Sequence, residues 1–168
     1  LGTLHEEFKN APTLGSLLDP AKSPAANIVK WEDLISVLTK ALDMDRTDLD
    51  LEAGVIAQEL TKAAEIVSNK YAWIITNVPY LSRVKQNEIL REYCDEHHSL
   101  SKNDLATVFL DRCLELCASG GVSSIVLPQN WLFLPGYKKF RIELLEYGRW
   151  KLIARLGPGA FETISGEV

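Results

Sequence analysis

Four consecutive residues, Asn77-Val78-Pro79-Tyr80, carry the clearest chemistry in this sequence. Pro79 disfavours helical backbone at the residue before it, so we expect Val78 to be extended and the loop to be short and stiff. The amide of Asn77 and the neighbouring carbonyls can accept hydrogen bonds from an exocyclic amine, and the ring of Tyr80 can stack on a flat group. The alternative interpretation is an ordinary turn, in which Asn77 bonds its own backbone and Tyr80 packs on the core.

The residues before this tetrapeptide predict a strand that ends where the loop begins. Tyr71–Thr76 is short, β-branched and aromatic, and its near-continuous apolarity is typical of a strand buried on both faces of a parallel sheet. A second strand is predicted over Val122–Leu127 and is stopped by Pro128. A third is predicted over Trp150–Leu156 and is stopped by Gly157-Pro-Gly.

Helical patterns separate these predicted strands. We expect a loop and then a helix over Leu81–His98. Ser101-Lys-Asn-Asp104 has the form of a helix N-cap with an acid three residues on. An apolar stripe follows over Leu105–Cys117, and Ser119-Gly-Gly is expected to end that helix. A further helix is predicted over Gly136–Tyr147. Strands that alternate with helices in this way indicate an α/β fold with a parallel sheet and flanking helices.

The first part of the chain has a different character. Residues 1–30 hold three prolines and predict an irregular lead-in. Helices are expected over Ile28–Leu42 and from about Asp50 to Ser68. One apolar side of the second helix should be buried, formed by Leu51, Val55, Ile56, Leu60, Ala63 or Ala64, and Val67. We therefore divide the chain into a lead-in and helical insert, 1–69, and a second part, 70–168, that carries the Asn77–Tyr80 loop.

Ligands of open parallel sheets bind beyond the carboxyl ends of the strands. In addition to Asn77–Tyr80, this rule selects Pro128–Phe133 and Gly157–Phe161. The amides of Gln129 and Asn130 and the ring of Trp131 are candidates to line the rim of a site, although Trp131 could equally be a core residue. Arg83 and Lys85 follow the first loop and are candidates for contacts to a phosphate backbone.

The composition excludes several classes of protein. The chain has 168 residues, is 46% hydrophobic and has a net charge of −5, which excludes a disordered chain and argues against a generic basic nucleic-acid coat. No apolar run approaches the roughly 18 residues that span a membrane. Three cysteines, an odd and sparse set, indicate free thiols in a reducing compartment such as the cytoplasm. Cys113 and Cys117 lie four residues apart on an apolar helix face, which favours buried thiols over a metal site.

Taken in order, these motifs resemble the second half of an adenine-N6 DNA methyltransferase. Asn77–Tyr80 resembles the [Asn/Asp]-Pro-Pro-[Tyr/Phe] motif of amino-group methyltransferases. The segments that agree with the family in order and spacing are Asp104–Leu116, Gly120–Trp131, Phe140-Arg141 with Leu144-Leu145, and Leu156–Phe161. The closest resemblance is to the large methylases of restriction-modification and phage-exclusion systems, and it is strongest over residues 71–161.

The resemblance implies a partial Rossmann-like class I methyltransferase fold and transfer of a methyl group from S-adenosylmethionine to adenine N6 in double-stranded DNA. The target base would be turned out of the duplex. Asn77 and the Val78 carbonyl would orient the amine, Pro79 would hold the loop and Tyr80 would stack on the base. The implied substrate contacts are Gln129, Asn130, Trp131, Arg83 and Lys85. The resemblance also implies a specificity or restriction subunit or domain as a partner. It implies no association with a membrane.

Two departures from the family pattern matter. Val78 stands where the family has its first proline. It keeps the carbonyl and an extended bias, so we expect reduced or retuned activity. The glycine-rich cofactor turn and the acid that holds the ribose have no match, and Gly157-Pro-Gly does not replace that turn. We therefore expect a fragment, inactive in isolation, whose cofactor-binding half lies upstream of residue 1.

Two other functions stay open on these residues. One is a methyltransferase-like subunit that binds DNA without catalysis, with Val78 marking the loss of activity. The other is a related transferase that acts on a protein glutamine or an RNA base, because the same loop chemistry serves any planar amide or amine.

Overall fold

The computed structural model describes residues 8–22, 48–148 and 150–157, apart from the side chains of 48–53 and 147. The chain divides into two compact units, Leu1–Lys70 and Tyr71–Val168, and each is described here by itself. The helix predicted over Ile28–Leu42, and the predicted site segment after Gly157, lie outside the described residues. No helix within the described ranges is long and apolar enough to cross a membrane.

The first unit is helical. Its first described part holds short helical segments: α2 (Ala11–Leu14), η1 (Gly15–Leu17) and η2 (Pro20–Lys22). The long helix α4 (Asp48–Ser68) confirms the helix predicted from about residue 50 to 68. This helix contacts η2.

The buried face of α4 differs from the expected one. Ala57, Thr61 and Ala64 are buried, whereas Val55 and Ile56 are exposed. Ala57, Thr61 and Ala64 recur at intervals of four and three residues and so share one side of the helix, which is the side that is covered. The expectation that Val55 and Ile56 share the buried side is therefore wrong.

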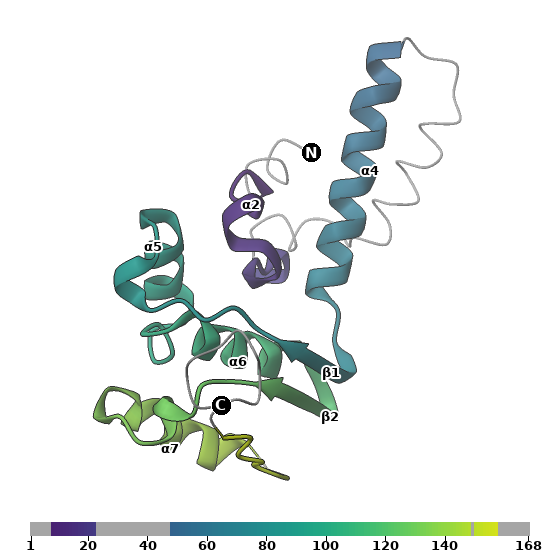
Figure 1. Ribbon diagram of the computed structural model, residues 1–168. Coiled ribbons are helices and arrows are strands. Elements are labelled where there is room, and N and C mark those ends of the chain that lie inside the picture. The colour runs from purple at the N-terminus through teal and green to yellow at the C-terminus, as the bar shows by residue number, and fades with distance from the viewer. Residues whose placement is uncertain (1–7, 23–47, 149, 158–168) are drawn as a thin grey trace. The chain divides into compact units, whose positions relative to one another are not determined.

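The second unit contains a parallel two-stranded sheet. Strand β1 (Tyr71–Asn77) pairs with β2 (Cys117–Val126), and the two lie side by side in Figure 1. Between them come η4 (Arg83–Lys85), α5 (Glu88–His97) and α6 (Leu105–Leu116). After them come η5 (Gln129–Leu132), η6 (Pro135–Tyr137) and α7 (Lys138–Tyr147). The predicted α/β character and parallel pairing are confirmed; across the described residues the sheet has only these two strands.

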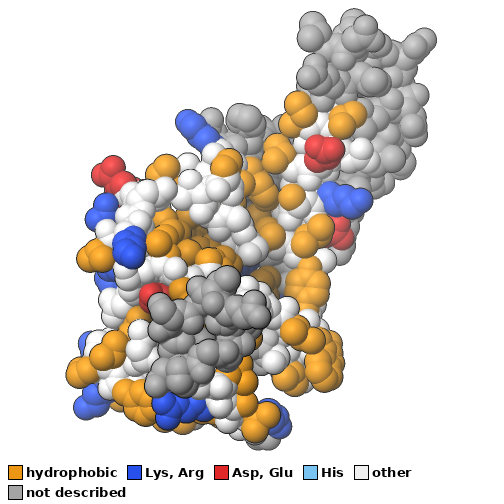
Figure 2. All heavy atoms as spheres, in the orientation of Figure 1, with side chains coloured by type: hydrophobic (Ala, Val, Ile, Leu, Met, Phe, Trp, Pro, Cys, Tyr) orange, Lys and Arg blue, Asp and Glu red, His pale blue; other side chains and the backbone are white. Residues whose placement is uncertain are grey.

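Only one face of β1 is covered by the described residues. Ile74 and Thr76 are half-buried on the face where α6 packs, while Trp73 and Ile75 on the opposite face are 71% and 76% exposed. Figure 2 shows hydrophobic side chains at the surface over these strands. The prediction that the strand is buried on both faces is wrong here, because α6 covers only one side of the pair.

The glycines after α6 form a bulge instead of a helix end. The helix stops at Leu116, and β2 begins at Cys117. Tyr71 pairs with Cys117, but Trp73 pairs with Val122, so β2 carries extra residues at this point. Gly120 has φ 76°, and a Cβ on Gly121 would lie 2.8 Å from the Tyr71 carbonyl oxygen. Only glycines fit this bulge, which explains the Ser-Gly-Gly sequence.

Helix α6 is capped by Asp104, not by Ser101 as predicted. The Asp104 carboxylate accepts a hydrogen bond from the Ala106 amide at 2.9 Å, and Asp104 has extended backbone. Ser101 is fully buried, and its hydroxyl lies within hydrogen-bonding distance of His98 and Asp111. The Ser101 hydroxyl is therefore already engaged, and the cap passes to the acid three residues later.

The third predicted strand does not form. Residues 150–157 are irregular, and Leu152 is 83% exposed. A strand needs a neighbour whose backbone groups complete its hydrogen bonds. Within the described ranges no strand pairs with this segment, so the apolar pattern of 150–156 lacks the partner that would make it a strand.

The residues that follow β2 in the chain form a hydrophobic cluster. Its buried members are Trp131, Tyr137, Phe140 and Leu144. They come from η5, η6 and α7, so this cluster attaches the segment after β2 to helix α7. The predicted helix ending at Tyr147 is confirmed.

A buried polar network joins α6 to the turn that precedes it. Nδ1 of His98 donates to Oδ2 of Asp111 at 2.9 Å, and Oγ of Ser101 lies 3.1 Å from the same carboxylate oxygen. The side chain of His98 is almost entirely buried. A buried donor without a partner costs about 1–3 kcal/mol, so the Asp111 carboxylate stabilises this turn by satisfying two groups together.

We expect Asp111→Ala to lower the free energy of local opening around residues 98–111 by about 1–3 kcal/mol, because the buried His98 ring loses its acceptor. The Ser101 hydroxyl loses one of two acceptors and keeps the His98 carbonyl at 3.2 Å. Amide hydrogen exchange of the intact protein measures this opening. Asp111→Asn retains an acceptor oxygen and should lose less. Equal exchange in the wild type and Asp111→Ala would contradict the role of the network.

Two of the three thiols are buried. Burial raises the pKa of Cys94 and of Cys113 from 9.0 to about 11. A raised pKa means that the folded state favours the neutral thiols. Their contribution to stability is complete below about pH 9 and is lost as the pH rises toward 11.

We expect Cys94 and Cys113 to react slowly with a thiol reagent at pH 8, because only about one thiol in a thousand is ionised when the pKa is near 11. Mass spectrometry of labelled peptides measures the rate at each cysteine. The urea-unfolded protein serves as the control and should label fast. Complete labelling of both residues in the folded protein within minutes would show that the burial is wrong.

Candidate functional site

The two strands of the second unit end together. Asn77, the last residue of β1, pairs with Val126, the last residue of β2. Because the strands are parallel, the segments that follow them leave the sheet at the same edge. The predicted site segments 77–80 and 128–133 therefore start from adjacent positions on one edge of the sheet.

The loop after β1 alternates between exposed and buried residues. Asn77 and Pro79 are exposed, Val78 is only 6% exposed, and Tyr80 is half-buried. Burial of a valine side chain contributes about 1.5–3 kcal/mol, so Val78 anchors the loop by packing. The Asn77 amide is thereby held at the surface beside the end of the sheet.

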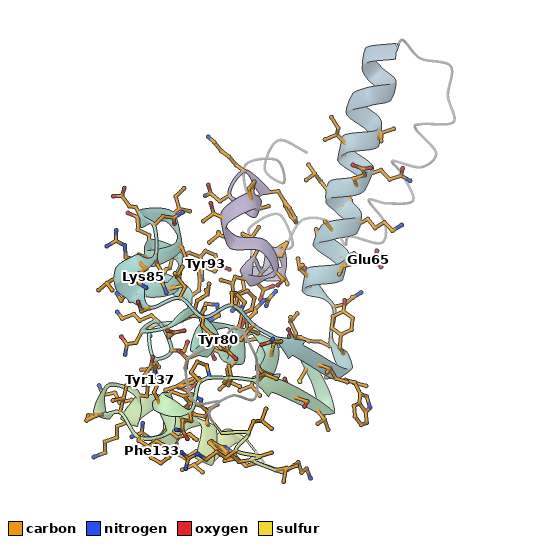
Figure 3. The ribbon with its side chains drawn as sticks, in the orientation of Figure 1. Glu65, Tyr80, Lys85, Tyr93, Phe133 and Tyr137 are labelled. Carbon is orange, nitrogen blue, oxygen red and sulfur yellow. The ribbon has the colours of Figure 1, made fainter. Side chains whose placement is uncertain are left out.

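The hydroxyl of Tyr80 is buried, and it has no hydrogen-bond partner among the described residues. The pKa of Tyr80 is raised, first by burial and then by the negative charge of Asp104. The phenol therefore stays neutral. Tyr80 comes from the loop that follows β1 (Figure 3) and lies close enough to Asp104, the N-cap of α6, to feel its charge.

Backbone hydrogen bonds tie the exit of this loop to the start of α6. The carbonyl of Leu81 accepts from the amide of Leu105 at 2.9 Å, and the amide of Arg83 donates to the carbonyl of Asn103 at 3.0 Å. Ser82 forms an antiparallel bridge with Asp104. The side chain of Gln86, itself buried, adds a bond to the Leu81 carbonyl at 3.2 Å.

The two predicted phosphate-binding residues have different environments. Arg83 forms an ion pair with Asp95 at 2.6 Å, and Lys102 contacts the other oxygen of that carboxylate at 2.8 Å. The hydrogen bond from Lys102, and then that from Arg83, lowers the pKa of Asp95. Arg83 is thus engaged within the protein, whereas Lys85 is exposed (Figure 3).

In the segment after β2, the side-chain amide of Asn130 is exposed and the indole of Trp131 is buried. Asn130 is exposed and Gln129 half-buried, whereas Trp131 lies in the hydrophobic cluster with its ring centroid 6.0 Å from that of Phe140. Nη1 of Arg141 donates to the carbonyls of Trp131 at 2.7 Å and Leu134 at 2.8 Å, which holds the turn between them. Trp131 therefore supports the segment from the core side.

Two aromatic residues that follow β2 were not among the predicted site residues, although Phe133 ends the predicted segment Pro128–Phe133. Phe133 is 71% exposed (Figure 3), and Tyr137 is buried. Burial raises the pKa of Tyr137, the Thr107 hydroxyl lowers it, and the Asp104 charge raises it. Tyr137 thus reaches the same helix start as Tyr80. Phe133 was detectable as an apolar residue between two prolines, but its exposure depends on the turn that Arg141 holds.

The site offers acceptors and aromatic surface instead of acid–base pairs. The Asn77 amide and the backbone carbonyls of an extended loop can orient an amine, and Tyr80 can stack on its ring. Over the part of the chain that the structure describes, no group of three His, Cys, Asp or Glu side chains could hold a metal ion. Such a donor set suits a reaction that depends on positioning.

The sequence of this chain is similar to those of known methylases. A sequence profile of the Eco57I restriction-modification methylase family matches residues 9–161. The chain is 29% identical over 161 residues to the adenine-specific methyltransferase BrxX of Escherichia coli O9:H4 (strain HS), which covers 96% of this chain and 13% of BrxX. It is 31% identical over 113 residues to the adenine-specific methyltransferase PglX of Lacticaseibacillus casei (strain Zhang), which covers 66% of this chain and 9% of PglX.

The chain thus spans 13% or less of the length of these curated relatives. The family match covers most of the chain, including both segments at the sheet edge. The chain belongs to the Eco57I restriction-modification methylase family.

Proposed function

We propose that this chain carries the base-binding loop of an enzyme that transfers a methyl group from S-adenosylmethionine to N6 of adenine in double-stranded DNA. The observation that supports this most directly is the loop at the sheet edge. It exposes the Asn77 amide, anchors itself through buried Val78 and holds Tyr80 beside it. Two relatives that the chain matches are named adenine-specific methyltransferases.

In this proposal the loop acts by orientation. The side-chain oxygen of Asn77 and the carbonyl of Val78 would each accept a hydrogen bond from the adenine amine, which turns the nitrogen lone pair toward the methyl donor. The chemistry that S-adenosylmethionine supplies is an activated methyl group on a good leaving group. Alignment of amine and methyl then accounts for most of the rate, since no strong base is required.

The donor set fits such a cofactor, because neutral acceptors at the end of a parallel strand suit a reaction without acid–base catalysis. Among the described residues, Asn77–Tyr80 would border the cofactor. A glycine-rich turn that would hold its nucleoside has no counterpart in this sequence. We propose that the cofactor-binding half lies elsewhere in the longer protein and that the isolated chain is inactive.

The remaining contacts follow from exposure. Tyr80 would stack on the extruded adenine, and the amides of Gln129 and Asn130 would line the adjacent rim, with Trp131 supporting them from the core. Lys85 is the better candidate for a phosphate contact, because Arg83 already pairs with Asp95. A specificity or restriction subunit or domain would select the DNA sequence, and the enzyme would act in the cytoplasm.

A second candidate is a methyltransferase-like subunit that binds DNA without catalysis. Val78 in place of the family's proline favours it. The burial of Val78 weakens this candidate, because packing supplies the anchoring that the proline ring would give.

We expect Asn77→Ala to lower methyl transfer by the intact protein at least about 100-fold, by analogy with the removal of one aimed hydrogen-bonding group from an active site. The assay follows labelled methyl from S-adenosylmethionine into unmethylated DNA, with digestion to nucleosides. Asn69→Ala, an exposed amide outside the loop, is the matched control and should keep wild-type activity.

The same methyl-transfer assay on the wild-type protein distinguishes the candidate functions. Label in N6-methyladenine supports the proposal. DNA binding without label supports the non-catalytic subunit, and label on protein or RNA supports a related transferase. An Asn77→Ala variant that methylates DNA at the wild-type rate would remove the loop from the mechanism.

We expect Tyr80→Phe to retain methyl transfer within about threefold, because the buried hydroxyl has no partner among the described residues and the ring is kept. Tyr80→Ala should lose about tenfold or more, since base–aromatic stacking contributes about 1–3 kcal/mol. Single-turnover rates on one DNA duplex measure both. Equal loss in the two variants would assign the role to the hydroxyl and contradict stacking.

A further inference from the structure

The first turn of α6 contacts both segments that leave the sheet edge. On one side it receives the exit of the Asn77–Tyr80 loop, and on the other Tyr137 reaches the Thr107 hydroxyl. Asp104 stands at the start of this turn. We propose that Asp104 is a positioning residue for the loop: it caps α6 and so fixes the backbone groups to which the loop exit is bound. This inference rests on the proposed function of that loop.

Backbone hydrogen bonds hold the loop at both of its ends. Its entry is fixed by β1, where Asn77 pairs with Val126. Its exit is fixed only one residue beyond Tyr80, where the Leu81 carbonyl accepts from Leu105 at 2.9 Å. With both ends fixed, the three residues between them have little freedom, so the position of the loop beside the Asn77 amide depends on where the amide of Leu105 lies.

The position of the Leu105 amide depends on the first turn of α6. The first four amides of a helix have no partner within the helix. Leu105 donates to the loop, and Ala106 donates to the carboxylate of Asp104 at 2.9 Å. Removal of the carboxylate leaves the Ala106 amide unpaired at the end of α6. The first turn then frays more readily, and the anchoring bond to Leu81 moves with it.

Asp104 also acts on the loop directly. Asp104 lies opposite Ser82 in the bridge whose hydrogen bonds are made by their neighbours, Leu105 to Leu81 and Arg83 to Asn103. The pKa of the Tyr80 phenol is raised by burial and then by the negative charge of Asp104. One residue thus contacts the loop exit, caps the helix and faces the proposed stacking residue. A cap that served helix stability alone would have none of these contacts to the loop.

Helix α5 provides the comparison for the experiment. Asn87 caps α5 by accepting from the Leu90 amide at 2.9 Å, the same distance as in the Asp104 cap. Both are side-chain caps, so their loss should destabilise the protein to a comparable extent. Asp104 caps the turn whose backbone amide binds Leu81. Asn87 caps a different helix, and its neighbour Gln86 reaches the Leu81 carbonyl only through a side chain, at 3.2 Å. The loss of Asp104 should therefore disturb methyl transfer more than the loss of Asn87.

The experiment compares Asp104→Ala, Asp104→Asn and Asn87→Ala in the intact protein. We expect Asp104→Ala to lower kcat about tenfold or more, with KM for DNA and S-adenosylmethionine changed less than about threefold, because a small displacement of a reacting group is costly. Asn87→Ala should keep kcat within about twofold. Asp104→Asn should restore kcat to within about threefold of wild type, because Asn caps as well as Asp.

Three outcomes would overturn the proposal: equal loss of kcat in both alanine variants, unchanged kcat in Asp104→Ala, or an Asp104→Asn variant as slow as Asp104→Ala. Failure of the proposed function looks different, because then the wild type itself transfers no methyl group to adenine. Amide exchange of residues 78–86 then decides: faster exchange in Asp104→Ala, but not in Asn87→Ala, supports the positioning role, and equal exchange rejects it.

Discussion

The backbone ladder between β1 and β2 is the constraint on which the candidate site depends. The strands are parallel and stop together, Asn77 opposite Val126. Everything that follows them in the chain therefore emerges at one edge, although the two segments lie about fifty residues apart in sequence. A change in register would move Asn77 away from the edge and would invert which of its neighbours face α6.

At this edge of the sheet, buried side chains hold the backbone in place and neighbouring exposed side chains are accessible to a ligand. Val78 is buried, and the residues on either side of it are exposed. The same division recurs after β2, where Trp131 is buried beside exposed Asn130. In both segments a hydrophobic side chain holds the backbone while an adjacent amide faces outward. This arrangement supplies hydrogen-bond acceptors in fixed positions without placing a charge in the core.

The sequence predicts much of the second unit because its signals are local. The β-branched run from Tyr71 and the helical period from Leu105 both match the structure. The errors have tertiary causes. Ser101 and Asp104 both satisfy the rule for a cap, and the choice between them depends on His98 and Asp111, which engage the serine hydroxyl.

Other features depend on partners that no local pattern reveals. A glycine pair after a helix is read as a helix end, but here it forms a bulge against Tyr71. The run 150–156 has the pattern of a strand but no partner among the described residues. The tetrapeptide Asn77–Tyr80 is a candidate because of its residue types and its resemblance to a family motif, whereas the exposure of Phe133 and the approach of Tyr137 to Asp104 require the fold.

The double hydrogen bond from Arg141 has a consequence for the order of folding. Its guanidinium satisfies two carbonyls of the turn after β2, yet Arg141 itself belongs to α7. The final shape of the turn and the placement of this helix residue therefore depend on each other. The contacts span only seven and ten residues, so the closure is local and fast. We infer that this turn and helix assemble as one cooperative unit.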